Sequence, residues 1–244
     1  MSDMGERLLW SKVRTRRIKN FPAKYTPVLL ERIAELVDIH GQGGDTVLDP
    51  MAGVGGIHAL RELTRLSGLW TQGIELEQEW ADCHFATEQG SVLELPFPDM
   101  FFDWVIVSPP YGNRMADNHM PGPDDKSNRI TYRHRLGRAL AAGSAGGMQW
   151  GDGYREFHRS AWAEAVRVLK PGGHFVLNCK DHIRKGVVQP VTQFHVDTLS
   201  EDLGMRIIQS DRVPVSGNGF GQNGKARIPY ENIVLLRKWK IVSR

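Results

Sequence analysis

Short apolar runs alternate along this chain with longer segments of helical periodicity, and this alternation limits the folds that the chain can adopt. One run, FFDWVIVS (101–108), is almost continuously apolar, which is typical of a strand buried on both faces in the middle of a parallel sheet. Shorter strand-like runs at 46–50, 72–76 and 174–179 are separated by helix-like segments. Such alternation predicts an α/β fold, with a doubly wound and mostly parallel sheet covered by helices.

The sequence also predicts where individual elements begin and end. Thr26 and Pro27 form a favourable helix start, and Gly41 is expected to end that helix. The strands expected at 205–215 and 231–239 are joined by a short connection, which predicts an antiparallel pair at the sheet edge. Further helices are expected over 56–66, 77–88, 153–169 and 190–203.

Bulk properties exclude several classes of protein. The 244 residues are enough for one well-buried domain, and no apolar run approaches the length of a membrane span. The first twenty residues lack the apolar core of a signal peptide, so we expect a cytoplasmic protein. Cys83 and Cys179 are far apart in the sequence, which supports neither a disulfide framework nor a cysteine zinc site. We therefore expect no metal and no membrane partner, and the oligomeric state stays open.

A glycine-rich turn follows the first predicted strand. It reads DPMAGVGG (49–56), and Glu75 stands twenty residues after Gly55, at the end of the next strand. Glycines between a strand and a helix let the backbone approach a ligand closely, and a carboxylate at the next strand end can accept hydrogen bonds from ribose hydroxyls. By itself this pattern also fits a nicotinamide-binding unit, or a glycine turn with no ligand.

The second motif, Ser108-Pro109-Pro110-Tyr111, directly follows the apolar strand. Ligands of open α/β sheets bind outside the carboxyl ends of strands, where the strand order reverses. A serine hydroxyl and a proline carbonyl could accept hydrogen bonds from the two protons of an amino group, making its lone pair available for attack. Tyr111 offers a flat face for stacking a base. The alternative is that the four residues merely turn the chain.

Together these motifs resemble the signatures of class I S-adenosylmethionine-dependent amino-methyltransferases. The segments that support the resemblance are DPMAGVGG (49–56), IEL (74–76), SPPY (108–111) and VLKPGG (168–173), while FPAKYTP (21–27) resembles the upstream cofactor segment of the DNA enzymes. The resemblance covers nearly the whole chain. It implies one methyltransferase domain over residues 1–244, with a seven-stranded Rossmann-like sheet whose last strand is antiparallel.

The resemblance further implies S-adenosylmethionine as the cofactor. Asp49, Gly53 and Gly55 would line its methionine part, and Glu75 would bind its ribose. Ser91 stands where the family often has an acidic residue that contacts the adenine amino group. The complete set of expected cofactor residues is Lys24, Tyr25, Asp49, Pro50, Met51, Gly53, Gly55, Glu75, Leu76, Ser91, Val92 and Ser108.

The expected reaction is direct methyl transfer to an exocyclic amino nitrogen of a flipped DNA base, with Ser108, Pro109, Pro110 and Tyr111 as the catalytic residues. Serine before Pro-Pro-Tyr favours N4 of cytosine over N6 of adenine within the resembling family. Methylation of a cytosine ring carbon is disfavoured, because it needs an attacking thiolate and neither cysteine follows a proline.

A basic stretch at 112–150 holds six Lys/Arg residues against three Asp residues. We expect this inserted loop to engage nucleic acid through Arg129, Arg133, Arg135 and Arg138, because phosphate contacts position a nucleic acid. The alternative is an ordinary variable loop.

Three other functions stay open. An RNA base amino-methyltransferase is compatible with Tyr111-Gly112 followed by Arg114, so RNA is not excluded as a partner. A protein-glutamine methyltransferase would more usually have Asn before Pro-Pro-Tyr. A non-catalytic DNA-binding module is disfavoured by the intact cofactor motifs.

Overall fold

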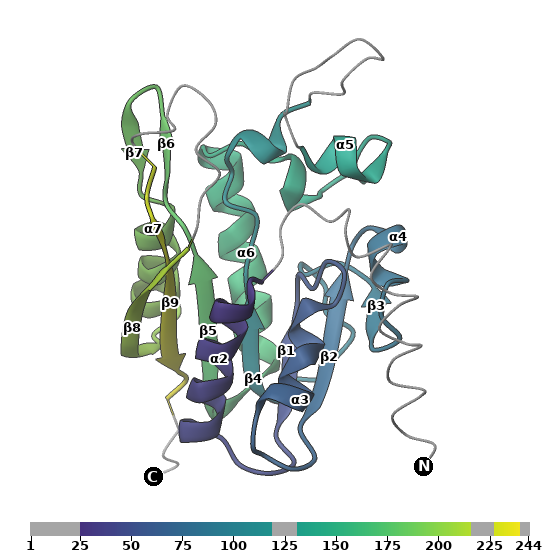
Figure 1. Cartoon of the computed structure of the whole chain (residues 1–244), viewed down its shortest axis with the longest axis vertical. Coiled ribbons are helices and arrows are strands. Elements are labelled where there is room, and N and C mark those ends of the chain that lie inside the picture. The colour runs from purple at the N-terminus through teal and green to yellow at the C-terminus, as the bar shows by residue number, and fades with distance from the viewer. Residues whose placement is uncertain (1–24, 119–130, 216–226, 240–244) are drawn as a thin grey trace.

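The computed structural model describes residues 25–118, 131–215 and 227–239. Its centre is a seven-stranded sheet in the order β3-β2-β1-β4-β5-β9-β8 (Figure 1). Strands β1 to β5 are mutually parallel, and β9 runs antiparallel to both of its neighbours. The strands are β1 (Thr46–Asp49), β2 (Trp70–Glu75), β3 (Thr87–Gln89), β4 (Phe102–Val107), β5 (Leu169–Cys179), β8 (Arg206–Pro214) and β9 (Tyr230–Arg237).

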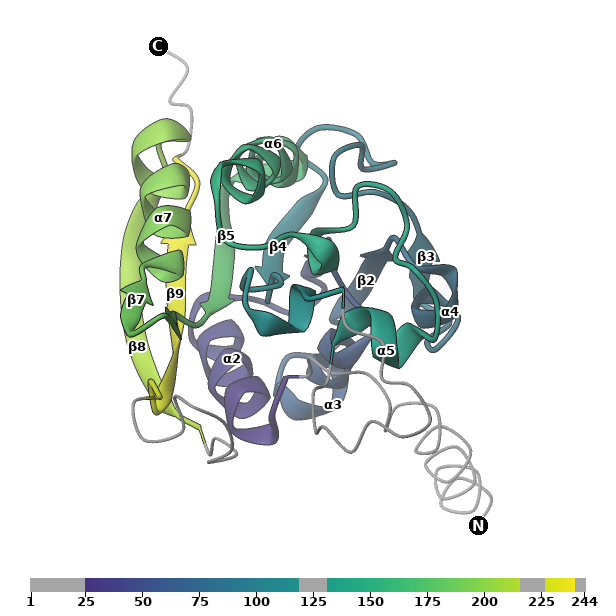
Figure 2. The same cartoon turned by 90° about the horizontal axis from the view of Figure 1, so that it is seen from above.

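Helices cover both faces of this sheet, as Figure 2 shows. On one face lie α2 (Pro27–His40), the 3-10 turn η1 (Gly56–Ala59) and α3 (Leu60–Leu63); on the other lie α6 (Asp152–Val168), α7 (Val191–Asp197) and the π-helical turn η4 (Thr198–Asp202). Successive side chains of a strand point to opposite faces, so Val105 packs under α6 while Ile106 packs under α2. The predicted doubly wound α/β fold is confirmed.

The strand order reverses between β1 and β4. From β1 the chain moves outward through β2 to β3, then returns to β4 on the other side of β1. Because β1 and β4 are parallel neighbours, with Leu48 paired to Val105, their carboxyl ends meet at one edge of the sheet. The glycine-rich turn and the SPPY segment therefore begin side by side.

The two longest predicted helices agree closely with α2 and α6, and the last two strands form the predicted antiparallel pair. The helix predicted over 77–88 is wrong. Only α4 (Gln78–Ala81) is helical there, and Thr87 to Gln89 form β3. Thr87 pairs with Gly73 of β2, so an edge strand forms through contacts outside the segment. A small hairpin of β6 (His182–Arg184) and β7 (Val187–Gln189) was not predicted either.

The described part of the basic stretch contains short helical pieces. They are η2 (Arg114–Ala116), α5 (Tyr132–Leu136) and η3 (Ala145–Gly147). Figure 1 shows α5 at the end of the sheet where the parallel strands finish. Within the ranges described, no helix has the length and apolarity needed to cross a lipid bilayer.

Asp103 joins the amino ends of three central strands. Its carboxylate accepts hydrogen bonds from the backbone N–H (3.0 Å) and hydroxyl (2.8 Å) of Thr46, at the start of β1. Lys170, at the start of β5, donates to both of its oxygens at 2.8 and 2.9 Å. Burial alone would raise the pKa of Asp103, but the hydrogen bonds from Lys170 and Thr46 hold it below its usual value. Asp103 thus connects β4 to both neighbours.

We expect Asp103→Asn to lower the free energy of unfolding by about 1 to 2 kcal/mol at pH 7, because the ion pair is lost and the remaining hydrogen bonds weaken. Since the folded-state pKa is lowered, this stabilisation is present at neutral pH and disappears as the pH falls through that pKa. Urea unfolding at pH 7 and pH 3 measures it. Asp202→Asn, which removes only an exposed ion pair at 3.6 Å, is the control. An equal loss at both pH values would contradict this account.

Candidate active site

A cavity of about 480 Å³ opens at the carboxyl ends of β1, β2 and β4. Most of the expected cofactor residues line it, although they come from distant parts of the sequence. Those that line it are Tyr25, Pro50, Met51, Gly55, Glu75, Leu76, Ser91, Val92 and Ser108. Lys24 lies outside the described residues. A cavity of this size is typical of a site for a small molecule or cofactor.

Asp49 and Gly53 support the cavity from behind its wall. Asp49 is buried, and its carboxyl group accepts hydrogen bonds from the Tyr25 hydroxyl (3.3 Å) and the Met51 N–H (3.0 Å). The N–H of Gly53 donates to Glu75 at 2.9 Å. Asp49 therefore fixes the start of the glycine-rich turn, and Gly53 fixes the carboxyl group at the end of β2.

Glu75 presents its carboxyl group to the cavity in a fixed orientation. One oxygen accepts the Gly53 N–H and the other accepts the Glu77 N–H, both at 2.9 Å. Burial raises the pKa of Glu75 to about 7, and burial with the nearby Glu75 charge likewise raises the pKa of Asp49 to about 7. A cavity-lining carboxyl group whose pKa is raised by burial, with a second such group behind the wall, is typical of a binding site.

The conformation of Gly55 keeps the cavity open. Its φ angle is +81°, and a Cβ atom there would lie 2.7 Å from the Cβ of His84 and 2.8 Å from Cδ2 of His58. Any other residue would be strained by its backbone and would displace these rings. The aromatic rings of Trp80 and Phe157 also line the cavity. Glycine at the turn, a carboxyl group at the strand end and apolar walls fit the ribose and adenine of S-adenosylmethionine.

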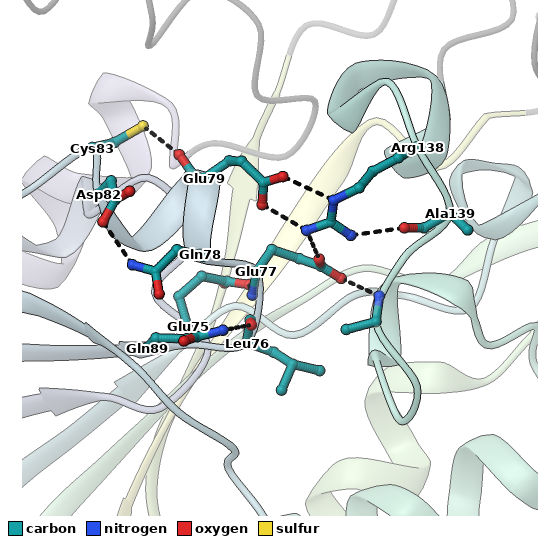
Figure 3. Close-up of polar contacts among 11 residues, drawn as sticks. Glu75, Leu76, Glu77, Gln78, Glu79, Asp82, Cys83, Gln89, Arg138 and Ala139 are labelled. Atoms are coloured by element: carbon teal, nitrogen blue, oxygen red, sulfur yellow. Dashed lines mark hydrogen bonds and ion pairs between the residues drawn. The ribbon is translucent and has the colours of Figure 1, made fainter.

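The basic stretch forms another wall of this cavity, which was not predicted. Tyr132, Gly143, Ala145 and Gly146 line it. Figure 3 shows how Arg138 attaches the segment to α4: its guanidinium group donates to both oxygens of Glu79, at 2.8 and 2.6 Å, and its Nη2 lies 2.9 Å from Glu77. The other Glu77 oxygen accepts the N–H of Ala141 at 2.7 Å. This attachment holds the segment that contains Tyr132 and residues 143–146 against the cavity.

The four arginines expected to bind nucleic acid have different environments. Arg129 lies outside the described residues, and Arg138 is already paired with two carboxylates. Arg133 and Arg135 of α5 each have a buried Nε atom with no hydrogen-bond partner in the described parts of the chain. Among the described residues neither of them forms an ion pair, so their positive charges are not neutralised there as that of Arg138 is.

The SPPY segment leaves β4 at the cavity. Ser108 and Pro110 line it, whereas Pro109 is buried and Tyr111 reaches toward β9. The hydroxyl of Tyr154 on α6 donates to the Pro110 carbonyl at 2.7 Å. That hydroxyl also lies 2.9 Å from Nε2 of His195, whose Nδ1 accepts the indole N–H of Trp162 at 2.9 Å. The backbone of the SPPY segment is therefore fastened to α6 and α7.

Sequence reasoning missed two polar residues beside Ser108. Asn178 is the penultimate residue of β5 and is fully buried, and Glu231 lies near the start of β9. The Asn178 side-chain amide donates to the Ser108 hydroxyl oxygen (3.1 Å) and to Glu231 (3.0 Å). Neither residue belongs to a sequence motif, and the two meet only through the antiparallel pairing of β5 with β9.

In the described ranges no cluster of three or more His, Cys, Asp or Glu residues could hold a metal ion.

We expect Glu75→Gln to weaken S-adenosylmethionine binding by about 10- to 100-fold at pH 8, because hydrogen bonds to a charged acceptor contribute about 1.5 to 3 kcal/mol. Below its pKa near 7 the Glu75 carboxyl group is protonated, so wild-type affinity should rise from pH 6 to pH 8. The variant should show a smaller rise, since Asp49 still titrates.

Isothermal titration calorimetry at both pH values measures the dissociation constants. Glu88→Gln, an exposed residue on the neighbouring strand β3, is the control. Equal cofactor affinity for wild type and Glu75→Gln at pH 8 would remove Glu75 from the site.

Comparison with solved structures supports this fold. The chain is similar to TrmN from Thermus thermophilus (TM-score 0.54, 17% identity), covering 89% of this chain and 50% of TrmN, so it spans about half the length of that protein. It is also similar to a SAM-dependent methyltransferase from Methanosarcina mazei, with a TM-score of 0.53 and 13% identity over 89% of this chain and 100% of that chain. A third similar structure is a putative sarcosine dimethylglycine methyltransferase from Galdieria sulphuraria, with a TM-score of 0.51 and 16% identity over 89% of this chain and 92% of that chain. At these identities the likeness shows the class I methyltransferase fold.

The family follows from the sequence itself. No curated protein matches this chain. The model of the N6/N4 DNA methylase family matches residues 102–242, more than half of the chain, from the apolar strand β4 through β9. The cofactor of this family is S-adenosylmethionine, in agreement with the cavity beside Glu75. The chain therefore belongs to the DNA methylase family of S-adenosylmethionine-dependent methyltransferases.

Proposed function

We propose that this chain, as a single methyltransferase domain, methylates the exocyclic amino group of a flipped base in DNA, with N4 of cytosine favoured over N6 of adenine. One observation is central to the proposal. Ser108 of the SPPY segment lines the same cavity as Glu75, the candidate ribose ligand. A group that binds an amino nitrogen and a group that binds the cofactor thus face one space. The serine before Pro-Pro-Tyr supports cytosine.

Ser108 and Pro109 orient the target nitrogen. When bound, S-adenosylmethionine supplies an electrophilic methyl group. The Pro110 carbonyl already accepts the Tyr154 hydroxyl, so Pro109 is the candidate carbonyl for the amino protons. The Ser108 oxygen accepts the second proton. These hydrogen bonds strengthen as positive charge develops on the nitrogen, and they act from a backbone that is held in place before the substrate arrives.

Tyr111 is the candidate surface for the flipped base. Its hydroxyl is fixed by Ser108 (3.1 Å) and Glu231 (3.0 Å), so the orientation of its ring is set. Because the ring is already fixed, less orientational entropy is lost when a base binds against it. Extrusion of the base from a duplex is needed, because an amino group inside the stack cannot reach the sulfonium methyl group.

The decisive experiment supplies radiolabelled S-adenosylmethionine to the purified chain with duplex DNA, RNA and protein in parallel. We expect label in DNA, and we expect nucleoside mass analysis to find N4-methylcytosine. N6-methyladenine alone would overturn the cytosine assignment and leave a DNA enzyme. Label in RNA alone would replace the proposal by an RNA base amino-methyltransferase, and label in protein alone by a protein-glutamine methyltransferase.

We assign phosphate contact to Arg133 and Arg135, which form no ion pair among the described residues, in contrast to Arg138. Replacing both by alanine should weaken DNA binding and lower the slope of log affinity against log salt by about 2, because each phosphate contact releases condensed counterions. Fluorescence anisotropy from 50 to 300 mM salt measures this. Arg65→Ala, with a 94% exposed side chain, is the control. An unchanged slope would remove both arginines from the interface.

A further inference from the structure

A line of hydrogen bonds leads from Ser108 away from the cavity. The Ser108 hydroxyl lies 3.1 Å from the Tyr111 hydroxyl, and Tyr111 donates to a carboxylate oxygen of Glu231 at 3.0 Å. The line thus connects a cavity-lining hydroxyl of the SPPY segment with a carboxyl group on β9, 120 residues later in the chain. In the proposed reaction Glu231 only orients the Tyr111 ring, and Asn178 has no role.

Asn178 fixes the direction of this line. Its amide nitrogen donates to the Ser108 oxygen at 3.1 Å and to the Glu231 carboxylate at 3.0 Å. The flipped amide would place its oxygen against the carboxylate, which is repulsive, so the nitrogen must face Glu231. The Oδ1 atom is consequently buried without a hydrogen-bond partner in the described residues. The two hydrogen bonds that the amide nitrogen donates to Ser108 and Glu231 offset the free-energy cost of the unsatisfied Oδ1 atom.

The direction of each proton follows from these contacts. A carboxylate only accepts, so the Tyr111 proton points to Glu231. The Tyr111 oxygen can then only accept, and it lies 3.4 Å from the Asn178 amide nitrogen and 3.1 Å from the Ser108 hydroxyl. The Ser108 oxygen already accepts from Asn178. The Ser108 proton therefore points to Tyr111, away from the cavity. One lone pair of the Ser108 oxygen is left for a proton of a target amino group.

We propose that Ser108, Tyr111 and Glu231 form a proton relay, with Glu231 as the final acceptor and Asn178 as the residue that positions the relay. This inference rests on the proposed function, and it adds two residues to the reaction. The carboxylate at the far end stabilises the positive charge that develops on the target nitrogen. It also gives the departing proton a path that does not cross the cofactor cavity.

The proton step balances atom by atom. Once the target nitrogen carries the methyl group it holds one proton too many. Its N–H bond breaks and an O–H bond forms on Ser108, while the original Ser108 proton moves to Tyr111 and the Tyr111 proton moves to Glu231. The products are a neutral methylated amine and a protonated Glu231, which returns its proton to solvent. Burial and the Glu231 charge raise the pKa of Tyr111, so it passes the proton on without ionising.

The test is single-turnover methyl transfer at saturating cofactor by Glu231→Gln. The glutamine oxygen can still accept the Tyr111 hydrogen bond, so the packing is kept while the charge and the proton acceptor are lost. We expect the rate to fall about 100-fold, with the dissociation constants for cofactor and nucleic acid within about twofold of wild type and no change in melting temperature. Glu156→Gln, an exposed glutamate on α6, is the control.

Tyr111→Phe provides a second test, because it keeps the ring and removes only the relay hydroxyl. If both residues act in one line, the double variant should be no slower than the slower single variant. A Glu231→Gln rate within about threefold of wild type, or a double variant slowed by the product of the single effects, would overturn the relay.

The relay is measured on whichever substrate the wild-type chain methylates, so it can fail separately from the proposed function. RNA-only methylation would refute the proposed DNA substrate and still allow the relay to be tested. A wild-type chain that methylates no substrate would refute both proposals.

Discussion

The parallel pairing of β1 with β4 places the two sequence motifs beside each other. Because these strands are neighbours at the point of reversal, the turns that follow them start at the same edge of the sheet. One turn leads into the glycine-rich segment and the other into SPPY. Asp103 supports the arrangement from the opposite end by joining the starts of β1, β4 and β5. The distance between the two halves of the site is therefore set by sheet geometry rather than by flexible loops.

Glutamate side chains at this edge of the sheet have three different roles. Glu75 faces the cavity with both oxygens oriented by backbone N–H groups. Glu77 lies behind it and, with Glu79, holds Arg138 and the segment that covers the cavity. Glu231 lies on the far side of Ser108 and closes a hydrogen-bonded line. The first is suited to a ligand, the second to structure and the third to a reacting proton.

Features that depend on residues close together in the sequence could be predicted from the sequence alone. The apolar run of β4 and the helical period of α6 were visible in the residues themselves, and the motifs marked nine of the residues that line the cavity. The short strand β3 was missed because Thr87 to Gln89 have no periodicity of their own and form a strand only by pairing with β2. Asn178 and Glu231 were missed because their meeting depends on the register between β5 and β9. The role of Arg138 in covering the cavity depends likewise on Glu77 and Glu79, about sixty residues away.

The attachment of Pro110 to the helices has a consequence for acid tolerance. His195 Nδ1 accepts the Trp162 indole proton, so it is the neutral imidazole, with hydrogen on Nε2, that completes the contact with Tyr154. Burial, aided by the neighbouring His158, lowers the pKa of His195 well below its ordinary value. The ring therefore stays uncharged at neutral pH, and the unfolded chain takes up a proton more readily than the folded one once the medium is acidified below about 6.5. Mild acid thus opposes folding through the imidazole that connects the SPPY backbone to α6 and α7, together with the buried His158, whose pKa is also lowered.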